Sequence, residues 1–258
     1  MGSVPDKRSE FRLPLEYGTE ILRCEVGSTL HGTGLPGGED LDEMGVFVER
    51  SSSVIGLKTA DHWIKRTAAQ GAKSQPGDVD LSMYSMRKWA RLALKGNPSI
   101  MLLLFAPKEK VLYTTEWGDT LRRNRDMFYS AKAGSSYLGY MRSQRHRMTG
   151  KKGRAGRVRL QEDGTVDWKY AMHMLRLGFQ GLEYLKTAHI SLPMVGDTGD
   201  YLRSVRRGEV PMSEVLAKSE DLEKKMVKLL DGSTIPPEPL YDMVEFHLVK
   251  THFEVWES

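Results

Sequence analysis

The chain has 258 residues, enough for one domain of ordinary size or two small ones. Apolar residues make up 40% and charged residues 28%, a balance that excludes a disordered chain. The longest apolar run, 100–106, is much shorter than the roughly 20 residues that cross a bilayer, so we expect no membrane span and a cytoplasmic location. The net charge of +4 is too small to indicate a nucleic-acid-binding protein by itself. The single cysteine, Cys24, lies in an apolar run, where we expect a core residue rather than a catalytic thiol.

The first part of the chain predicts a small sheet. A strand is expected at 21–26, ending at the turn residues Gly27 and Ser28. After a loop rich in glycine and proline, a second strand is expected at 41–50. A third is expected at 79–84, where apolar residues alternate with polar ones.

The remainder of the chain predicts helices. Apolar spacing near 3.6 residues, together with glycine and proline stop signals, defines helices at 85–95, 98–105, 135–148, 167–185, 213–230 and 240–253. We therefore expect an α/β (α+β) protein with a sheet-containing region at 1–130 and a predominantly helical region at 131–258.

Paired carboxylates mark the start of the second predicted strand. Asp40 and Asp42 are two residues apart, so in an extended backbone both side chains project from the same face. Magnesium prefers such oxygen ligands and commonly combines one or two carboxylates with substrate phosphates. A two-metal site needs a further carboxylate, for which Asp78 and Asp80 are both candidates. Spacing alone does not separate them; we prefer Asp80 because it begins the apolar alternation.

Gly27 and Ser28 provide a complementary phosphate contact. Glycine allows backbone amides to approach a phosphate closely, and the Ser28 hydroxyl can donate a further hydrogen bond. A different glycine pattern at 32–37 formally matches G-x-G-x-x-G, but no helix follows it directly, which argues against a dinucleotide-binding fold.

Together these residues resemble the signature of the DNA polymerase beta-like nucleotidyltransferase superfamily, in which a glycine–serine pair precedes two aspartates and a later strand carries a third. Further runs at 80–107 and 169–177 are similar to predicted bacterial and phage nucleotidyltransferases of unassigned substrate. One departure is Glu39, where many relatives have a small hydroxyl residue.

The resemblance implies a mixed sheet flanked by helices, a catalytic core at 1–130, and a helical region at 131–258 that closes over the nucleotide. It also implies that Asp40, Asp42 and Asp80 hold two magnesium ions, with manganese as a substitute, while Gly27 and Ser28 bind a nucleoside triphosphate. The expected reaction transfers a nucleoside monophosphate to an acceptor and releases pyrophosphate. The alternative is a nucleic-acid-binding or nucleotide-sensing protein built on an inactive nucleotidyltransferase scaffold.

Basic residues on the predicted 167–185 helix could hold the triphosphate. Lys169, His173 and Arg176 follow i, i+4, i+7 spacing and share one face. Such a pattern is also typical of a solvent-exposed basic surface. The resemblance favours the phosphate role, since relatives carry similar residue types on this helix.

A second basic group extends from 142 to 159 and could bind an RNA or DNA acceptor through its phosphates. Its members named as candidate contacts are Arg142, Arg145, Arg147, Lys151, Lys152 and Arg154. Tyr137 and Tyr140 could stack on bases beside them. A solvated helix face explains the same residues equally well.

Overall fold

The computed structural model describes residues 11–34, 41–69, 77–149, 167–232 and 234–258. The chain forms two compact units. The sheet unit comprises Met1–Ala93, Ile100–Met127 and Leu240–Ser258, and the helical unit comprises Leu94–Ser99 and Phe128–Pro239. None of the helices formed by the described residues combines the length and apolar character needed to cross a membrane.

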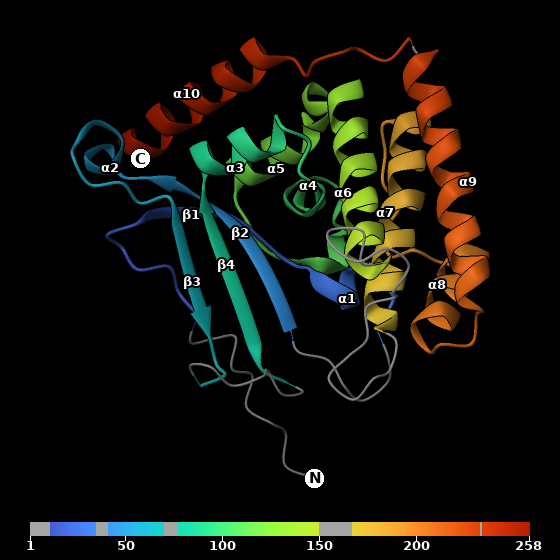
Figure 1. The fold of residues 1–258 in the computed structure, drawn as a ribbon. Helices are drawn as coiled ribbons and strands as arrows, with labels where there is room; N and C mark the ends of the chain where they lie inside the picture. Colours follow the sequence, from blue (N-terminus) through green and yellow to red (C-terminus); the bar gives the residue numbers. More distant parts are fainter. Residues whose placement is uncertain (1–10, 35–40, 70–76, 150–166, 233) are drawn as a thin grey trace. The chain divides into compact units, whose positions relative to one another are not determined.

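The sheet unit contains a five-stranded mixed sheet with the order β3-β4-β2-β1-β5 (Figure 1). Its strands are β1 (Gly18–Glu25), β2 (Leu41–Glu49), β3 (His62–Arg66), β4 (Val79–Ser85) and β5 (Val111–Thr114). Only the central pair, β2 and β4, is parallel among these strands; the other neighbours are antiparallel. This arrangement confirms the α/β class and the mixed sheet predicted from the sequence.

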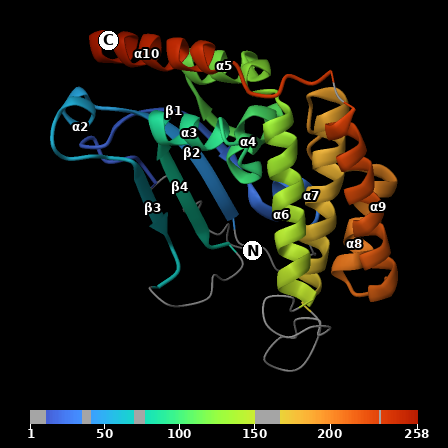
Figure 2. The same cartoon turned by 45° about the horizontal axis from the view of Figure 1, so that its top comes forward.

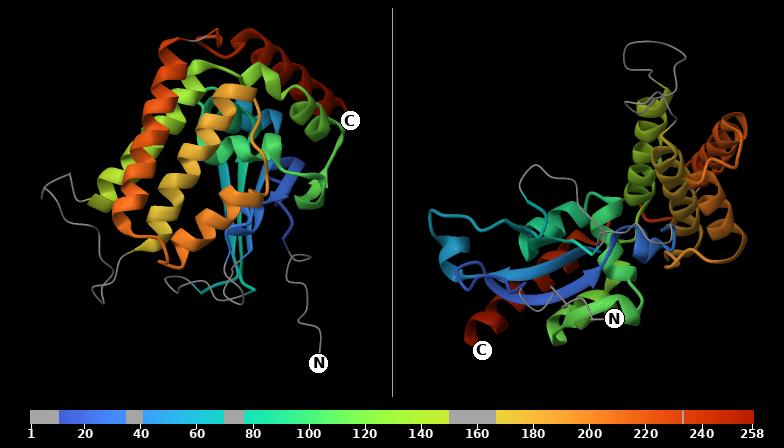
Figure 3. Two further views of the ribbon diagram at one scale, coloured as in Figure 1. Left: turned by 90° about the vertical axis from the view of Figure 1, so that its right-hand side faces the viewer. Right: turned by 90° about the horizontal axis from the view of Figure 1, so that it is seen from below.

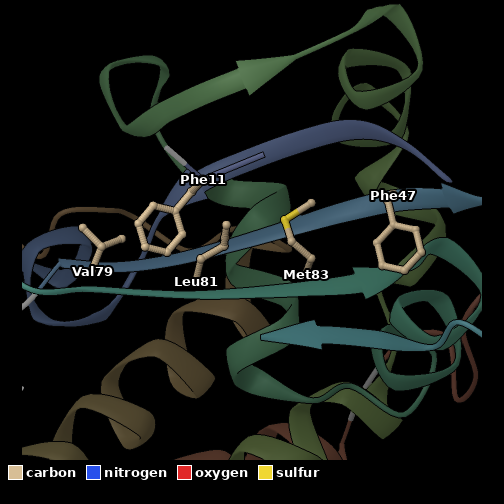
Figure 4. Packing of buried hydrophobic residues seen from close by; sticks show 5 residues of the cluster. All are labelled: Phe11, Phe47, Val79, Leu81 and Met83. Carbon is tan, nitrogen blue, oxygen red and sulfur yellow. The ribbon is translucent and has the colours of Figure 1, made fainter. Parts of the chain in front are cut away.

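Alternation along β4 separates a core face from a polar face. Val79, Leu81 and Met83 are buried and pack with Phe11 and Phe47, as Figure 4 shows. The intervening residues of β4 are only partly buried and project from the opposite face. The hydrophobic effect thus fixes which way this strand faces, because a shift by one residue would expose the entire apolar set.

Short helices lie between the strands along the chain or follow the last strand. They are α1 (Gly27–His31), α2 (Ser51–Ile55), α3 (Met86–Ala93), α4 (Pro98–Phe105) and α5 (Glu116–Arg123). In α3, the buried residues are Met86, Trp89, Ala90 and Ala93, the face expected from helical periodicity. The Trp89 indole donates a hydrogen bond to the Ile100 carbonyl at 3.2 Å, which ties α3 to α4.

The C-terminal helix α10 (Tyr241–Glu257) belongs to the sheet unit, whereas the sequence placed it in the helical region 131–258. Polar contacts with the end of β2 explain this difference. The two ring nitrogens of His252 lie 2.7 Å from the Leu248 carbonyl and 3.0 Å from the Glu49 carboxylate. The Trp256 indole donates to the Glu49 carbonyl at 2.7 Å. Figure 2 shows α10 beside α5, and the Trp117 indole of α5 donates to Glu254 at 3.0 Å.

Glu49 is buried at the centre of these contacts. Burial opposes its charge, but the hydrogen bond from His252 contributes to a net lowering of the pKa of Glu49. Arg87 of α3 also donates to the carboxylate, at 3.0 Å. The far end of the chain is therefore attached to the sheet through a charged network as well as apolar contacts.

The helical unit contains α6 (Ala131–Thr149), α7 (Trp168–Thr187), α8 (Gly196–Arg206) and α9 (Met212–Asp231), which Figure 3 shows from two further sides. Helix α7 is central and packs against each of the other three. Two glycines of α7 permit this close approach. A side chain at Gly178 would lie 2.6 Å from the Met141 sulfur, and one at Gly181 would lie 2.4 Å from Met226.

Candidate active site

Asp42 and Asp80 are brought together by the pairing of β2 with β4. They are register partners in the parallel ladder, so their Cα atoms lie on neighbouring strands, which are typically about 4.8 Å apart. Both side chains project from the face opposite the Val79 and Leu81 core. The pairing therefore places two carboxylates from distant parts of the chain side by side.

Gly27 lies directly against Asp42. The Val26 amide donates to the Asp42 carbonyl at 2.8 Å, which brings the start of α1 to the start of β2. Gly27 has φ +69°, and a Cβ there would lie 2.1 Å from Asp42 Oδ2. Any larger residue would occupy the space of the carboxylate, so glycine is required both for the backbone conformation and for this contact.

Ser28 follows within α1 and is partly exposed. Its carbonyl accepts a hydrogen bond from the Thr33 amide at 3.1 Å, which secures the short helical turn. The sequence predicted a simple turn at Gly27 and Ser28; the structure has the five-residue helix α1 at this position. The predicted phosphate-binding residues are thus held on one side of Asp42.

The two candidates for the third carboxylate have different surroundings. Asp78 precedes β4 and is buried, and its carboxylate accepts a hydrogen bond from the Thr67 hydroxyl at 2.7 Å. Asp80 is the partner of Asp42 in the sheet register. The register therefore favours Asp80 as the companion of Asp42, while the metal-binding role of either residue stays a prediction.

Arg66 of β3 is a further charged residue at this position. Its Nε lies 3.6 Å from Asp80 Oδ1, and the side chain is 64% exposed. Arg66 was not predicted as a site residue, because β3 is mostly polar and exposed and lacks the alternation of an interior strand. An exposed arginine beside a carboxylate stabilises it only modestly in water.

The remaining acidic residue, Asp40, lies outside the described residues. Among the residues that the structure describes, no group of three or more histidine, cysteine, aspartate or glutamate side chains is arranged to hold a metal ion. Asp42 and Asp80 nevertheless fit a divalent cation chemically, because both offer oxygen ligands and Gly27 has no side chain that would displace the Asp42 carboxylate.

Cys24 is buried in β1, and burial raises the pKa of its thiol to about 12. A thiol with such a pKa remains protonated at neutral pH and is a poor nucleophile. The expectation of a core cysteine is confirmed.

The predicted triphosphate contacts lie on α7 of the helical unit, in surroundings unlike a solvated surface. Lys169 is exposed, whereas His173 and Arg176 are only partly accessible. Burial, together with the nearby positive charges of Arg176, Lys169 and Arg206, lowers the pKa of His173 to about 3. Burial also lowers the pKa of Arg176 to about 10. At neutral pH this face therefore combines cations with an uncharged imidazole that can donate or accept a hydrogen bond.

Members of the second basic group, 142–159, have different surroundings in the structure. Arg142 Nε donates to Glu223 of α9 at 2.7 Å, and Arg145 also bonds to Glu223. These two arginines therefore join α6 to α9, a structural role that the sequence did not predict. Tyr137 is fully buried and cannot stack on a base, which corrects that expectation.

Other residues of the second basic group are exposed or lie outside the described residues. Arg147 is exposed on α6, and Tyr140 is 43% exposed. Lys151, Lys152 and Arg154 lie outside the described residues. A nucleic-acid contact through these residues stays a prediction.

The fold and the paired aspartates beside the Gly27–Ser28 segment define a protein of the DNA polymerase beta-like nucleotidyltransferase superfamily. More particularly, residues 15–230 match the family RlaP, described as the RNA repair pathway DNA polymerase beta family. Because this match covers most of the chain, the protein belongs to that family. Membership supports a nucleotidyltransferase activity in general.

Two individual proteins show more limited similarity. An uncharacterized 38.9 kDa protein of the nrdC-mobD intergenic region of Enterobacteria phage T4 is 29% identical over 126 residues, which are 48% of this chain and 37% of the phage protein. The chain thus matches less than half of that relative's length. The second is a nucleotidyltransferase-like protein from Exiguobacterium sibiricum with a crystal structure. Its alignment covers 83% of this chain and 70% of the Exiguobacterium chain, at 12% identity and a TM-score of 0.31.

Proposed function

We propose that the protein transfers a nucleoside monophosphate from a nucleoside triphosphate to an RNA acceptor and releases pyrophosphate. The observation that carries this proposal is the register pairing of Asp42 with Asp80, with Gly27 seated against the Asp42 carboxylate. Membership of a family described by an RNA repair pathway supports an RNA acceptor.

In this proposal Asp42 and Asp80, together with Asp40, hold two magnesium ions, for which manganese can substitute. When bound, such ions neutralise phosphate charge and stabilise the entering and leaving oxygens of an in-line displacement. The carboxylates act by fixing the positions of these ions, so loss of one ligand removes more than a single charge. Gly27 leaves the Asp42 carboxylate in its position, and the Ser28 hydroxyl donates to a phosphate oxygen.

The proposed transfer is a single displacement at the α-phosphorus. A hydroxyl oxygen of the acceptor forms a bond to that phosphorus as the bond to the bridging oxygen breaks, and pyrophosphate leaves. The acceptor proton passes to Asp80, whose carboxylate lies on the same sheet face as Asp42. Within the helical unit, Lys169 and Arg176 are proposed to bind phosphate oxygens, and neutral His173 can donate a further hydrogen bond.

The test is to incubate the full-length protein with magnesium, a single-stranded RNA and each α-labelled nucleoside triphosphate in turn, and then to separate labelled RNA from free nucleotide. We expect labelled RNA with at least one nucleotide. The Asp42→Asn variant should lose about 1,000-fold or more of this activity, because an amide is a much weaker ligand for magnesium.

Asp126→Asn provides a matched control, since Asp126 is exposed and belongs to the same unit. It should retain wild-type activity, and both variants should unfold at the wild-type temperature. Near-normal transfer by Asp42→Asn would overturn the proposal. Salt-dependent RNA binding by the wild type, with no nucleotide consumed under any condition, would instead favour the inactive scaffold.

A further inference from the structure

Three arginines near the end of α8 differ in how their charges are compensated. Arg203 pairs with Asp200, and Arg207 Nε lies 2.6 Å from Glu209 Oε1. Arg206, between them, pairs with no carboxylate in the described part of the chain, and its buried Nη1 atom has no hydrogen-bond partner there. Burying an uncompensated guanidinium nitrogen is costly, so its retention calls for a functional explanation.

Helix packing directs this end of α8 towards the start of α7. Just beyond α8, Gly208 has φ +76°, and a Cβ there would lie 2.8 Å from the Trp168 indole nitrogen. Trp168 is the first residue of α7 and directly precedes Lys169. The close contact of Gly208 with Trp168 therefore brings the Arg206 segment to the end of α7 that carries the basic face.

The charges around His173 on that face are all positive. Arg176, Lys169 and Arg206 each act on its imidazole, so Arg206 belongs to the same electrostatic neighbourhood. The Arg142 and Arg145 pair shows the usual structural solution in this unit, a shared carboxylate from Glu223. The three charged groups that act on the His173 imidazole are cations, an arrangement that attracts an anion.

We infer that Arg206 completes a polyphosphate-binding site with Lys169, His173 and Arg176, formed entirely within the helical unit. The three α7 residues extend over about 10 Å of helix, more than a single phosphate group requires. Arg206 adds a planar donor group from a second helix, which can bind two phosphate oxygens at once. The identity of the ligand, the triphosphate of the nucleotide substrate, rests on the proposed function.

The probe for this site is inorganic tripolyphosphate, titrated calorimetrically into the full-length protein without divalent metal. Arg206→Gln should weaken binding about tenfold or more, the usual effect of losing charge-assisted hydrogen bonds. Arg207→Gln removes the same charge one residue away but breaks only the pair with Glu209, and should remain within about twofold of wild type. Equal affinities for the two variants would overturn the inference.

Folding and ligand class need separate readouts. Arg206→Gln should unfold at the wild-type temperature or above it, because Nη1 is buried and has no described partner to lose. If that variant unfolds, Arg206→Lys is used instead; it retains the charge without the planar fork and should still bind tripolyphosphate more weakly than wild type. An Arg206→Gln variant that binds tripolyphosphate normally but a single-stranded RNA weakly would assign the site to the acceptor and overturn the polyphosphate assignment.

Failure of the polyphosphate-binding inference can be distinguished from failure of the proposed nucleotide transfer. Asp42→Asn lies in the other unit and should bind tripolyphosphate as the wild type does while losing nucleotide transfer. Retained transfer by Asp42→Asn would contradict the catalytic proposal and leave the tripolyphosphate comparison intact.

Discussion

The two units place their charged residues by different means. In the sheet unit, strand register sets Asp42 opposite Asp80, and the alternation of β4 decides which face they share. In the helical unit, packing between helices decides whether a basic residue is neutralised, as with Arg145 and Glu223, or has no carboxylate partner among the described residues, as with Arg206. The face on which a strand residue lies follows from local alternation, whereas the fate of a helical charge depends on its neighbour in space.

After the loss expected for Asp42→Asn, the next largest effect is expected at Gly27, where the sheet unit has no space for an added methyl group. Gly27→Ala should reduce nucleotide transfer about 100-fold, because the new methyl group would displace the Asp42 carboxylate and small displacements of catalytic groups cost about that much. Steady-state measurement of labelled product gives the rate.

The control for this variant is Gly77→Ala. Gly77 also has positive φ, +84°, but a Cβ there would meet nothing within 4 Å. Both variants carry similar backbone strain, on the order of 1 kcal/mol, and should lose similar stability from it. Only Gly27→Ala should lose activity, and an equal loss in Gly77→Ala would contradict the importance of the contact with Asp42.

A smaller effect, on stability alone, tests the helical unit. Glu223→Gln would leave Arg142 and Arg145 without their shared carboxylate and should lower the free energy of unfolding by about 1–3 kcal/mol. Urea denaturation measures this loss. Asp221→Asn breaks the exposed pair with Lys225 on the same helix and should produce no measurable change. If Glu223→Gln proves equally silent, the two arginines have no structural role and return to the candidates for RNA binding.

The smallest expected effect concerns pH. The pKa of His173 is lowered from 6.5 to about 3 in the folded protein, so as pH falls below about 6.5 the unfolded chain gains a proton that the folded one does not. Stability therefore rises with pH across this window, and His173→Gln should show a shallower dependence between pH 7 and pH 5. Urea titrations at each pH measure the slope. Identical slopes for variant and wild type would show that folding does not lower the pKa of His173.

Added tripolyphosphate sharpens this measurement. A bound anion makes a protonated His173 less unfavourable, so it should flatten the pH dependence of the wild type. The His173→Gln variant should show a smaller change on addition of the same ligand.

The sequence predicted the fold class, the superfamily and much of the core. Alternation identified β4, and helical spacing identified the buried face of α3 around Trp89. It did not predict β3, which is largely exposed, β5, which has four residues, or α8, which begins with glycine. These elements lack the periodic burial on which the predictions rested.

The candidate site was predictable in part. The acidic residues were recognised by spacing, but the preference for Asp80 over Asp78 gained support only from pairing with β2, because both residues have the same parity along the chain. Arg206 could not be distinguished from Arg203 and Arg207 without knowing which of them has a carboxylate partner. Metal binding, nucleotide contacts and the acceptor stay predictions.

The attachment of α10 to β2 has a consequence for how the protein is made. Glu49 and His252 are 203 residues apart, so at roughly 5–20 residues per second the ribosome needs about 10–40 seconds to supply the second after the first. All segments of the helical unit are synthesised during this interval, before the sheet unit has its last helix. The nascent chain thus acquires the complete set of polyphosphate-binding candidates while the unit that bears Asp42 and Asp80 still awaits its final element.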